Sequence, residues 1–410
     1  MLHIQPPSQP PHAPHPILNL GFRIFFSGGA LFAIVTMLLW SFVFTGKTAL
    51  NATEINPFYW HAHEMLYGYA MAIVAGFLLT AVKTWTGVMM PYGYRLAGIF
   101  AFWAVARMCW MLIGLGVGSL DLWLAVAALA DLLFMLCSAG AVIHAVIAVK
   151  QYKQMGIISK LVLLSIGNAL CYWGIISADQ DYQRIGVYLG LYLIMGIVLT
   201  IGRRVVPFFI ERGLSHDSDK PVTVKNSNLL DSLSLLSFLI FMLADVFYPN
   251  PYLITITATM VALVNGVRLA GWHQPQLWQK PLLWSLFIAF LGMCLSFVLF
   301  AIQPWMNFAH SIPVHALALS GIGLMTVAMM ARVSLGHTGR SIHAPPATVT
   351  AIFVLMVLAF VFRVVMPLIA IDQYMTWIMI AQTAWIACFT LFCVSYLPIL
   401  AKPRTDGLFG

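Results

Sequence analysis

Twelve stretches of this chain are apolar and long enough to cross a lipid bilayer as helices, since a hydrocarbon core about 30 Å thick needs roughly 20 helical residues. They lie near residues 24–44, 63–82, 94–115, 120–149, 158–178, 185–201 with an amphipathic continuation to 210, 229–247, 252–271, 282–302, 308–333, 349–371 and 375–401. Charged residues make up 8% of the chain, against roughly 25% in soluble domains. The pattern predicts an all-α polytopic membrane protein with about twelve transmembrane helices.

The segments between these spans are too short to fold as soluble domains, so residues 21–410 are expected to form a single membrane domain. Residues 1–20 are rich in proline and lack the pattern of a cleaved signal peptide, which favours a disordered cytoplasmic leader. The six cysteines lie in apolar runs without a Cys-x-x-Cys pair, so we expect reduced packing residues. The net charge of +8 is attributed to basic loops and requires no nucleic-acid partner.

The distribution of lysine and arginine predicts the orientation of the chain in the membrane. If the N-terminus is cytoplasmic, seventeen Lys and Arg residues fall on that side, whereas Lys47 and Arg184 fall on the other and Arg107 and Arg363 lie inside spans. Cytoplasmic loops carry the excess of positive charge in membrane proteins. We therefore expect a multi-pass membrane protein with both termini in the cytoplasm.

A cluster of polar residues, Trp60-His61-Ala62-His63-Glu64, opens the second span on the outer side and precedes an uncharged run from Met65 to Val82. Ionisable side chains are costly so close to lipid and indicate a functional site. Neutral imidazole is a good ligand for haem iron, copper and zinc. Glu64 is a candidate either to orient an imidazole or to carry protons as a catalytic residue. The alternative is that these residues belong to an interfacial aromatic belt beside Tyr59.

His61 and His63 cannot bind one metal from a regular helix, because residues two apart point about 200° from one another. Two arrangements remain open. Either His63 faces inward as a ligand while His61 serves a second site, or the chain is extended up to Ala62 and both histidines converge on one metal.

His315 lies in the tenth span about as deep as His63 lies in the second. One histidine from each of two facing helices is a common way to hold haem by two axial ligands, so we expect His63 and His315 to form such a pair. A lone histidine can instead bond a neighbouring backbone group. His337 follows His315 by 22 residues, about 33 Å of helix, and is expected in a different metal or cofactor site or in none.

On the inner side, Arg203 and Arg204 are candidate partners for carboxylates, haem propionates or lipid phosphates, or are ordinary membrane anchors. Arg107 and Asp131, on adjacent spans, are expected to neutralise one another, with a proton path as the alternative. A faint repeat with an offset of 126 residues relates His63, Leu189 and His315. If it is real, the chain consists of three sets of four spans, in which spans two, six and ten are equivalent and converge on a common centre.

Four motifs of the chain are familiar: LGFRIFF before the first span, WHAHEMLYGYAMAIVAGFLLTAV with TWTG after it, GRRVVPFF after the sixth span and MARVSLGHTGR after the tenth. Together they resemble the NnrS family over nearly the whole chain. The resemblance implies a twelve-span bacterial inner-membrane protein that binds haem and copper and is linked to nitric oxide, nitrosative stress and denitrification. The positions that match the motifs are His61, His63, Glu64, Arg203, Arg204, His315 and His337.

The chain departs from the family pattern at two positions. The motifs N-x-x-F-H-L and W-x-L-H-x-x-Y-x-W place histidines where this sequence has Tyr172 and Phe287. Neither side chain replaces imidazole as an equivalent ligand. If those histidines bind a cofactor in relatives, this chain has lost one metal, for which copper is the first candidate, and whether copper is retained stays open. A looser similarity to haem-copper oxidases and nitric oxide reductases concerns architecture and is weak evidence for shared chemistry.

The sequence thus favours a haem-binding protein that acts on or senses nitric oxide. Reduction of nitric oxide would need Glu64 as proton donor and an electron donor that the sequence does not identify, while scavenging and signalling remain open. The rival hypothesis is a secondary transporter of a small solute or metal. Against it, the loop after the second span lacks the G-x-x-x-D-R-x-G-R-R motif of major facilitators, and polar residues gather at the faces rather than at the midplane, where transported substrates bind.

Overall fold

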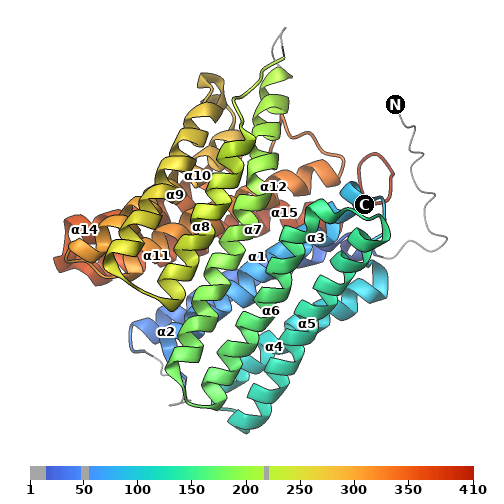
Figure 1. The fold of residues 1–410 in the computed structure, drawn as a ribbon. Coiled ribbons are helices and arrows are strands. Elements are labelled where there is room, and N and C mark those ends of the chain that lie inside the picture. Colours follow the sequence, from blue (N-terminus) through green and yellow to red (C-terminus); the bar gives the residue numbers. More distant parts are fainter. Residues whose placement is uncertain (1–14, 48–54, 217–220) are drawn as a thin grey trace.

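The structure, a computed structural model, describes residues 15–47, 55–216 and 221–410 (Figure 1). Twelve of its helical segments are long and apolar enough to cross a membrane, which confirms the predicted fold. Within these ranges no residue lies in a β-strand. The chain is therefore an all-helical, multi-pass membrane protein.

The spans follow one another along the chain, and three of them contain a π-helical segment. They are α1 (Gly21–Phe44), α2 (Pro57–His63) with π-helix η2 (Glu64–Ala70) and α3 (Met71–Thr86), α4 (Gly93–Gly114), α5 (Leu120–Ala148), α6 (Met155–Ile176), α7 (Gln180–Ser215), α8 (Asn228–Phe247), α9 (Pro251–Trp272), α10 (Pro281–Ile302), α11 (Ser311–Leu317) with π-helix η6 (Ala318–Leu324) and α12 (Met325–His337), α13 (Val349–Phe360) with π-helix η7 (Val361–Val365) and α14 (Met366–Ile369), and α15 (Tyr374–Ala401).

Short 3-10 turns join or precede these helices: η1 (Pro16–Leu18), η3 (Tyr152–Gln154), η4 (Pro275–Gln279), η5 (Gln303–Trp305) and η8 (Ile371–Gln373). Of the predicted leader, residues 1–14 lie outside the described residues. The remainder forms η1 and leads into α1 through Leu20, which is buried.

Spans two, six and ten lie at the centre of the bundle. The most apolar windows of these spans are 83%, 72% and 72% buried, more than in any other span of the described chain. The sixth span, α7, contacts η2 of the second span and η6 of the tenth. Helices α4 to α6 lie on one side of this centre and α8 to α10 on the other (Figure 1). The prediction that the three spans converge is confirmed.

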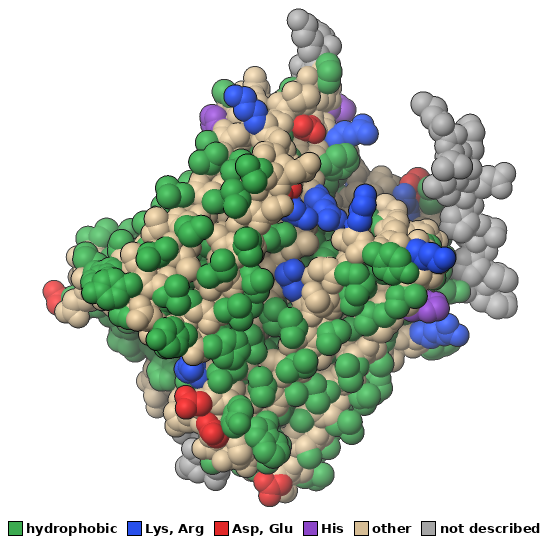
Figure 2. Space-filling model, in the orientation of Figure 1, with side chains coloured by type: hydrophobic (Ala, Val, Ile, Leu, Met, Phe, Trp, Pro, Cys, Tyr) green, Lys and Arg blue, Asp and Glu red, His purple; other side chains and the backbone are tan. Residues whose placement is uncertain are grey.

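The start of the first span is tied to the end of the last. The guanidinium of Arg23, fully buried, donates from Nη1 to the carbonyl oxygens of Leu400 and Lys402 at 2.6 and 2.7 Å, and from Nη2 to that of Gly410 at 2.6 Å. We call this end of the bundle, where α1 starts and α15 ends, the basic end, and the opposite one the histidine end. Most Lys and Arg side chains visible in Figure 2 lie toward the upper right, while hydrophobic side chains cover the flank.

The second and tenth spans share an unusual local structure that sets their register. Each begins with seven α-helical residues, continues with seven π-helical residues and then returns to α-helix. The three boundaries differ by 254 residues (311−57, 318−64 and 325−71), and so do His61 and His315 (315−61). The sequence repeat had implied an offset of 252, which pairs His63 with His315. In the structure His61 is the counterpart of His315.

Candidate functional site

The second span begins before both of its histidines. Asn56 caps α2 by accepting a hydrogen bond from the backbone amide of Phe58 at 3.0 Å, and Pro57 occupies the first helical position. Both features are typical helix starts. The alternative of an extended chain up to Ala62 is therefore wrong, and the helix directs His61 and His63 to different places.

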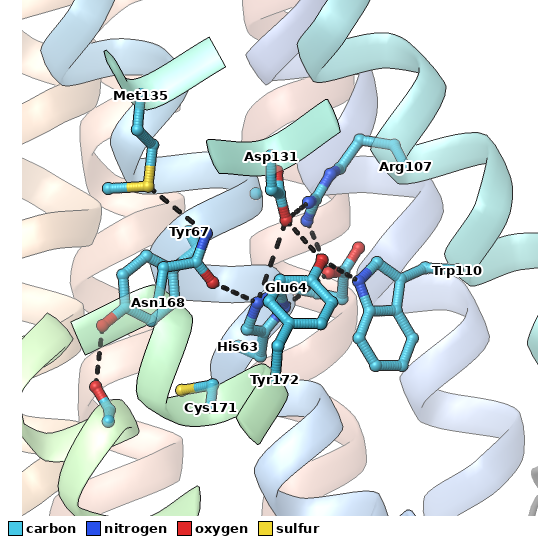
Figure 3. A network of polar contacts seen from close by, with 12 residues as sticks. His63, Glu64, Tyr67, Arg107, Trp110, Asp131, Met135, Asn168, Cys171 and Tyr172 are labelled. Carbon is cyan, nitrogen blue, oxygen red and sulfur yellow. Dashed lines mark hydrogen bonds and ion pairs between the residues drawn. The ribbon is translucent and has the colours of Figure 1, made fainter. Parts of the chain in front are cut away.

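His63 belongs to a closed polar cluster between the second span, α4, α5 and α6 (Figure 3). Its Nδ1 lies 2.9 Å from Oε1 of Glu64, and its Nε2 lies 2.8 Å from Oδ1 of Asn168. The amide nitrogen of Asn168 donates to the sulfur of Met135 at 3.3 Å, which fixes the orientation of the amide. Both ring nitrogens are thus within hydrogen-bond distance of a side-chain oxygen, so neither faces open space where a metal could bind.

Arg107 joins two carboxylates in this cluster. It donates to Glu64 at 2.5 Å and to Asp131 (Figure 3). Glu64 and Asp131 are 1% and 0% exposed, so their charges are shielded from water and lipid. The predicted pairing of Arg107 with Asp131 is confirmed. The imidazole of His63 lies beside the same two carboxylates, 2.9 Å from Oε1 of Glu64 and 3.9 Å from Oδ2 of Asp131.

Tyr172, one of the two positions at which the sequence was expected to depart from its resemblance, completes the cluster. Its hydroxyl donates to Asp131 at 2.7 Å and accepts from the indole of Trp110 at 3.0 Å. Its ring meets that of His63 edge-on, with centroids 5.3 Å apart. Phe287, at the other departing position, packs edge-on against His273 near the basic end. Tyr172 therefore serves as a hydrogen-bond donor to a buried carboxylate.

The expectation that His63 and His315 face one another is wrong. His315 lines a cavity of about 350 Å³ at the histidine end, and His63 does not. The imidazole that shares the cavity with His315 is that of His61. The physical reason is helix geometry: residues two apart on a regular helix point about 200° from one another, so α2 directs only one of its two histidines into the cavity, and that one is His61.

The walls of this histidine cavity are mainly aromatic and aliphatic, with few polar groups. Among them are Trp40, Phe58, Tyr69, Tyr188, Leu319 and Trp385. Ligand pockets commonly have about 300–1,000 Å³ and such apolar walls. The cavity is contributed by spans one, two, six, ten, eleven and twelve, so it is a feature of the whole bundle.

Both imidazoles of the cavity have the surroundings of candidate ligands. His61 stacks on Trp40, with ring centroids 4.4 Å apart and 12° between the planes, and its buried Nδ1 has no hydrogen-bond partner among the described residues. Nδ1 of His315 lies 2.7 Å from the carbonyl oxygen of Ser311. Donation to that carbonyl leaves the lone pair on Nε2, as is common for metal-ligating histidines.

Arg363 brings a positive charge into the same cavity from η7. Its Nη2 lies 3.1 Å from Nδ1 and 3.5 Å from Nε2 of His315, and its Nη1 is buried without a hydrogen-bond partner in the described chain. The amide nitrogen of Gln382, on α15, is also buried without a partner there. The sequence showed Arg363 as a cation within a span but gave no sign of its proximity to His315, and Gln382 carried no signal.

The other predicted site residues lie away from the cavity. Arg203 follows Leu191, which lines the cavity, by 12 residues (203−191), about 18 Å along α7. It lies 3.5 Å from Asp231, and Arg204 donates to Gln154 at 3.4 Å. His337 ends α12 at the basic end, where its ring packs 5.6 Å from that of Phe22. In the described ranges, no three His, Cys, Asp or Glu side chains form a metal-binding group.

The fold and the cavity together define a class: a polytopic helical membrane protein with paired histidines and an arginine in an apolar chamber at one end. The chain belongs to the NnrS family. The model of this family, whose description is NnrS protein, matches residues 16–404. No curated protein matches it. Membership in this family indicates a protein of the nitric oxide response.

Proposed function

We propose that this chain is a haem-binding membrane protein of the nitric oxide response, with His61 and His315 as the imidazole ligands. The observation that carries the proposal is that two imidazoles from facing spans share one apolar cavity. His61 offers a ring nitrogen without a partner, and Ser311 orients the ring of His315. Two histidines on different helices are a common haem-binding arrangement.

The guanidinium of Arg363 suits a propionate group of a haem. A guanidinium buried without a carboxylate is costly, and a haem propionate would supply the missing negative charge and accept hydrogen bonds. No carboxylate lies within ion-pair distance of Arg363 among the described residues. The proposal therefore gives Arg363 the propionate-binding role that the sequence had suggested for Arg203 and Arg204.

Bound haem would supply an iron that takes part in one-electron chemistry. The chain would hold the porphyrin by its imidazoles, anchor a propionate through Arg363 and exclude water with the walls of the cavity. Glu64 does not line the cavity and is engaged by Arg107 and His63, so the proposal gives it a structural role in place of proton delivery. Reduction of nitric oxide would require a separate proton route and an electron donor.

Copper is left out of the proposal. Tyr172 bonds Asp131 and Phe287 packs against His273, so neither departing position offers an imidazole to a second metal. We place the protein in a bacterial inner membrane with the basic end in the cytoplasm, because cytoplasmic loops carry the excess of Lys and Arg. The histidine cavity then lies toward the periplasm.

An absorption spectrum of the protein purified from haem-replete cells tests the proposal. We expect a Soret band that is lost or shifted in His61→Ala and in His315→Ala, because each change removes one imidazole ligand. His337→Ala is the matched control and should keep the band, because His337 lies about 33 Å of helix away from His315. A colourless wild-type preparation would favour the transporter hypothesis, and a band unchanged in position and intensity in both cavity variants would exclude these ligands.

A further inference from the structure

Arg332, on α12 at the basic end, is a buried cation without a counter-charge. Its side chain is 6% exposed, and its guanidinium carbon lies 3.9 Å from the centre of the Phe209 ring. Other buried arginines have polar partners: Arg23 has three carbonyl oxygens, and Arg107 and Arg268 have carboxylates. Arg332 has no hydrogen bond and no carboxylate within 4.0 Å in the described part of the chain.

Removing a charge from water costs several kcal/mol unless a partner compensates it. The ring of Phe209 offers a cation–π contact, worth about 0.5–2 kcal/mol, and does not use the five N–H donors of the guanidinium. The surroundings of Arg332 therefore suit an anion that would accept hydrogen bonds from those donors.

Arg332 lines a pocket of about 70 Å³ between the end of α7, the start of α10 and the segment after α12. Lys280 and His343 also line it, and no Asp or Glu does among the described residues. The ammonium of Lys280 donates to the carbonyl oxygen of Gly213 at 2.6 Å, which holds it at the pocket wall. At about 30 Å³ per water molecule, the space admits one small group rather than an extended ligand.

We propose that this pocket binds a phosphate group, with Arg332 as the main ligand and Lys280 as a second positive charge. A planar guanidinium matches phosphate oxygens through paired hydrogen bonds, and a lysine adds a point charge. Because the pocket opens at the basic end, the phosphate can come from the headgroup of an anionic phospholipid or from the aqueous phase. The site is separate from the histidine cavity and does not depend on haem.

The test measures thermal unfolding of the full-length protein by the labelling of its buried cysteines with a thiol-reactive dye. One arm titrates inorganic phosphate against chloride of equal ionic strength in neutral detergent. The other compares nanodiscs of phosphatidylcholine with and without phosphatidylglycerol. Ligands that bind the folded state raise the midpoint of unfolding, so a rise in the first arm indicates a free phosphate and a rise confined to the second indicates a lipid headgroup.

Arg332→Gln should need about tenfold more phosphate or anionic lipid for the same rise in the midpoint of unfolding, because the hydrogen bonds from the charged guanidinium to the phosphate are lost. Arg212→Gln is the matched control: Arg212 also stacks on a phenylalanine of α7, Phe208, but is exposed and does not line the pocket. It should respond like the wild type.

The proposal is overturned if neither ligand raises the midpoint of the wild type, or if Arg332→Gln responds as the wild type does. If Arg332→Gln does not fold, Arg332→Lys decides, because it keeps the charge and loses the planar fork. A response of Arg332→Lys equal to that of the wild type would also overturn the proposal.

Discussion

Arg107 is the residue on which the polar cluster of the second span depends. It forms an ion pair with Glu64 and another with Asp131 within the membrane-spanning region, where both carboxylates are buried. Removal of one partner from a buried ion pair leaves an uncompensated charge, and this costs more than the pair contributes. The cluster therefore constrains α4 and α5 against the span that carries His61.

We expect Arg107→Leu to lower the free energy of unfolding by about 3–5 kcal/mol, because two buried carboxylates lose their common partner. Tyr172→Phe removes the hydroxyl that donates to Asp131 and should lower the free energy of unfolding by about 1–3 kcal/mol. Unfolding by SDS titration with tryptophan fluorescence measures both. Equal losses in the two variants would show that the guanidinium does not hold the cluster together.

At the scale of elements, the contact between α6 and α7 depends on small residues. A Cβ atom added at Gly186 of α7 would lie 2.6 Å from the carbonyl oxygen of Gly167 and 2.7 Å from the backbone nitrogen of Cys171, both on α6. Backbone atoms cannot yield as flexible side chains do. Small residues let transmembrane helices approach closely, and here they hold α6 against the sixth span, α7, at the centre of the bundle.

Gly186→Ala should therefore force the two helices apart and lower the temperature of unfolding. Gly140→Ala on α5 is the matched control, because nothing lies within 4 Å of a Cβ added there. Alanine is favoured over glycine in a helix by about 1 kcal/mol, so the control should be neutral or slightly stabilising. A loss of stability in both variants would argue against the close contact as the cause.

The elements also show what the sequence could predict. The twelve spans follow from uninterrupted apolar runs, so their number and approximate bounds were accessible. The start of the second span was missed by six residues, although Asn56 and Pro57 form a recognisable helix start. The partner of His315 was not predictable, because the π-helical segments that set the register leave no pattern in side-chain types.

At the scale of the whole molecule, the excess of Lys and Arg at one end predicts the orientation in the membrane. A cysteine at position 117, in the exposed turn between α4 and α5, should react with a membrane-impermeant thiol reagent in spheroplasts. A cysteine at position 341, in the exposed segment after α12, should react with this reagent only after the cells have been lysed. The native cysteines of the described chain are buried or half-buried, so background labelling should be low. The reverse pattern would invert the proposed topology.

The bonds of Arg23 bear on how the protein is made. Its acceptors at Leu400, Lys402 and Gly410 come 377, 379 and 387 residues later in the chain. While the ribosome is still producing the intervening spans, this guanidinium has none of its final partners and must be solvated by water or lipid headgroups. The first helix to be inserted can therefore reach its final setting only after translation of the last one, and assembly of the bundle is completed as a late, post-insertion step.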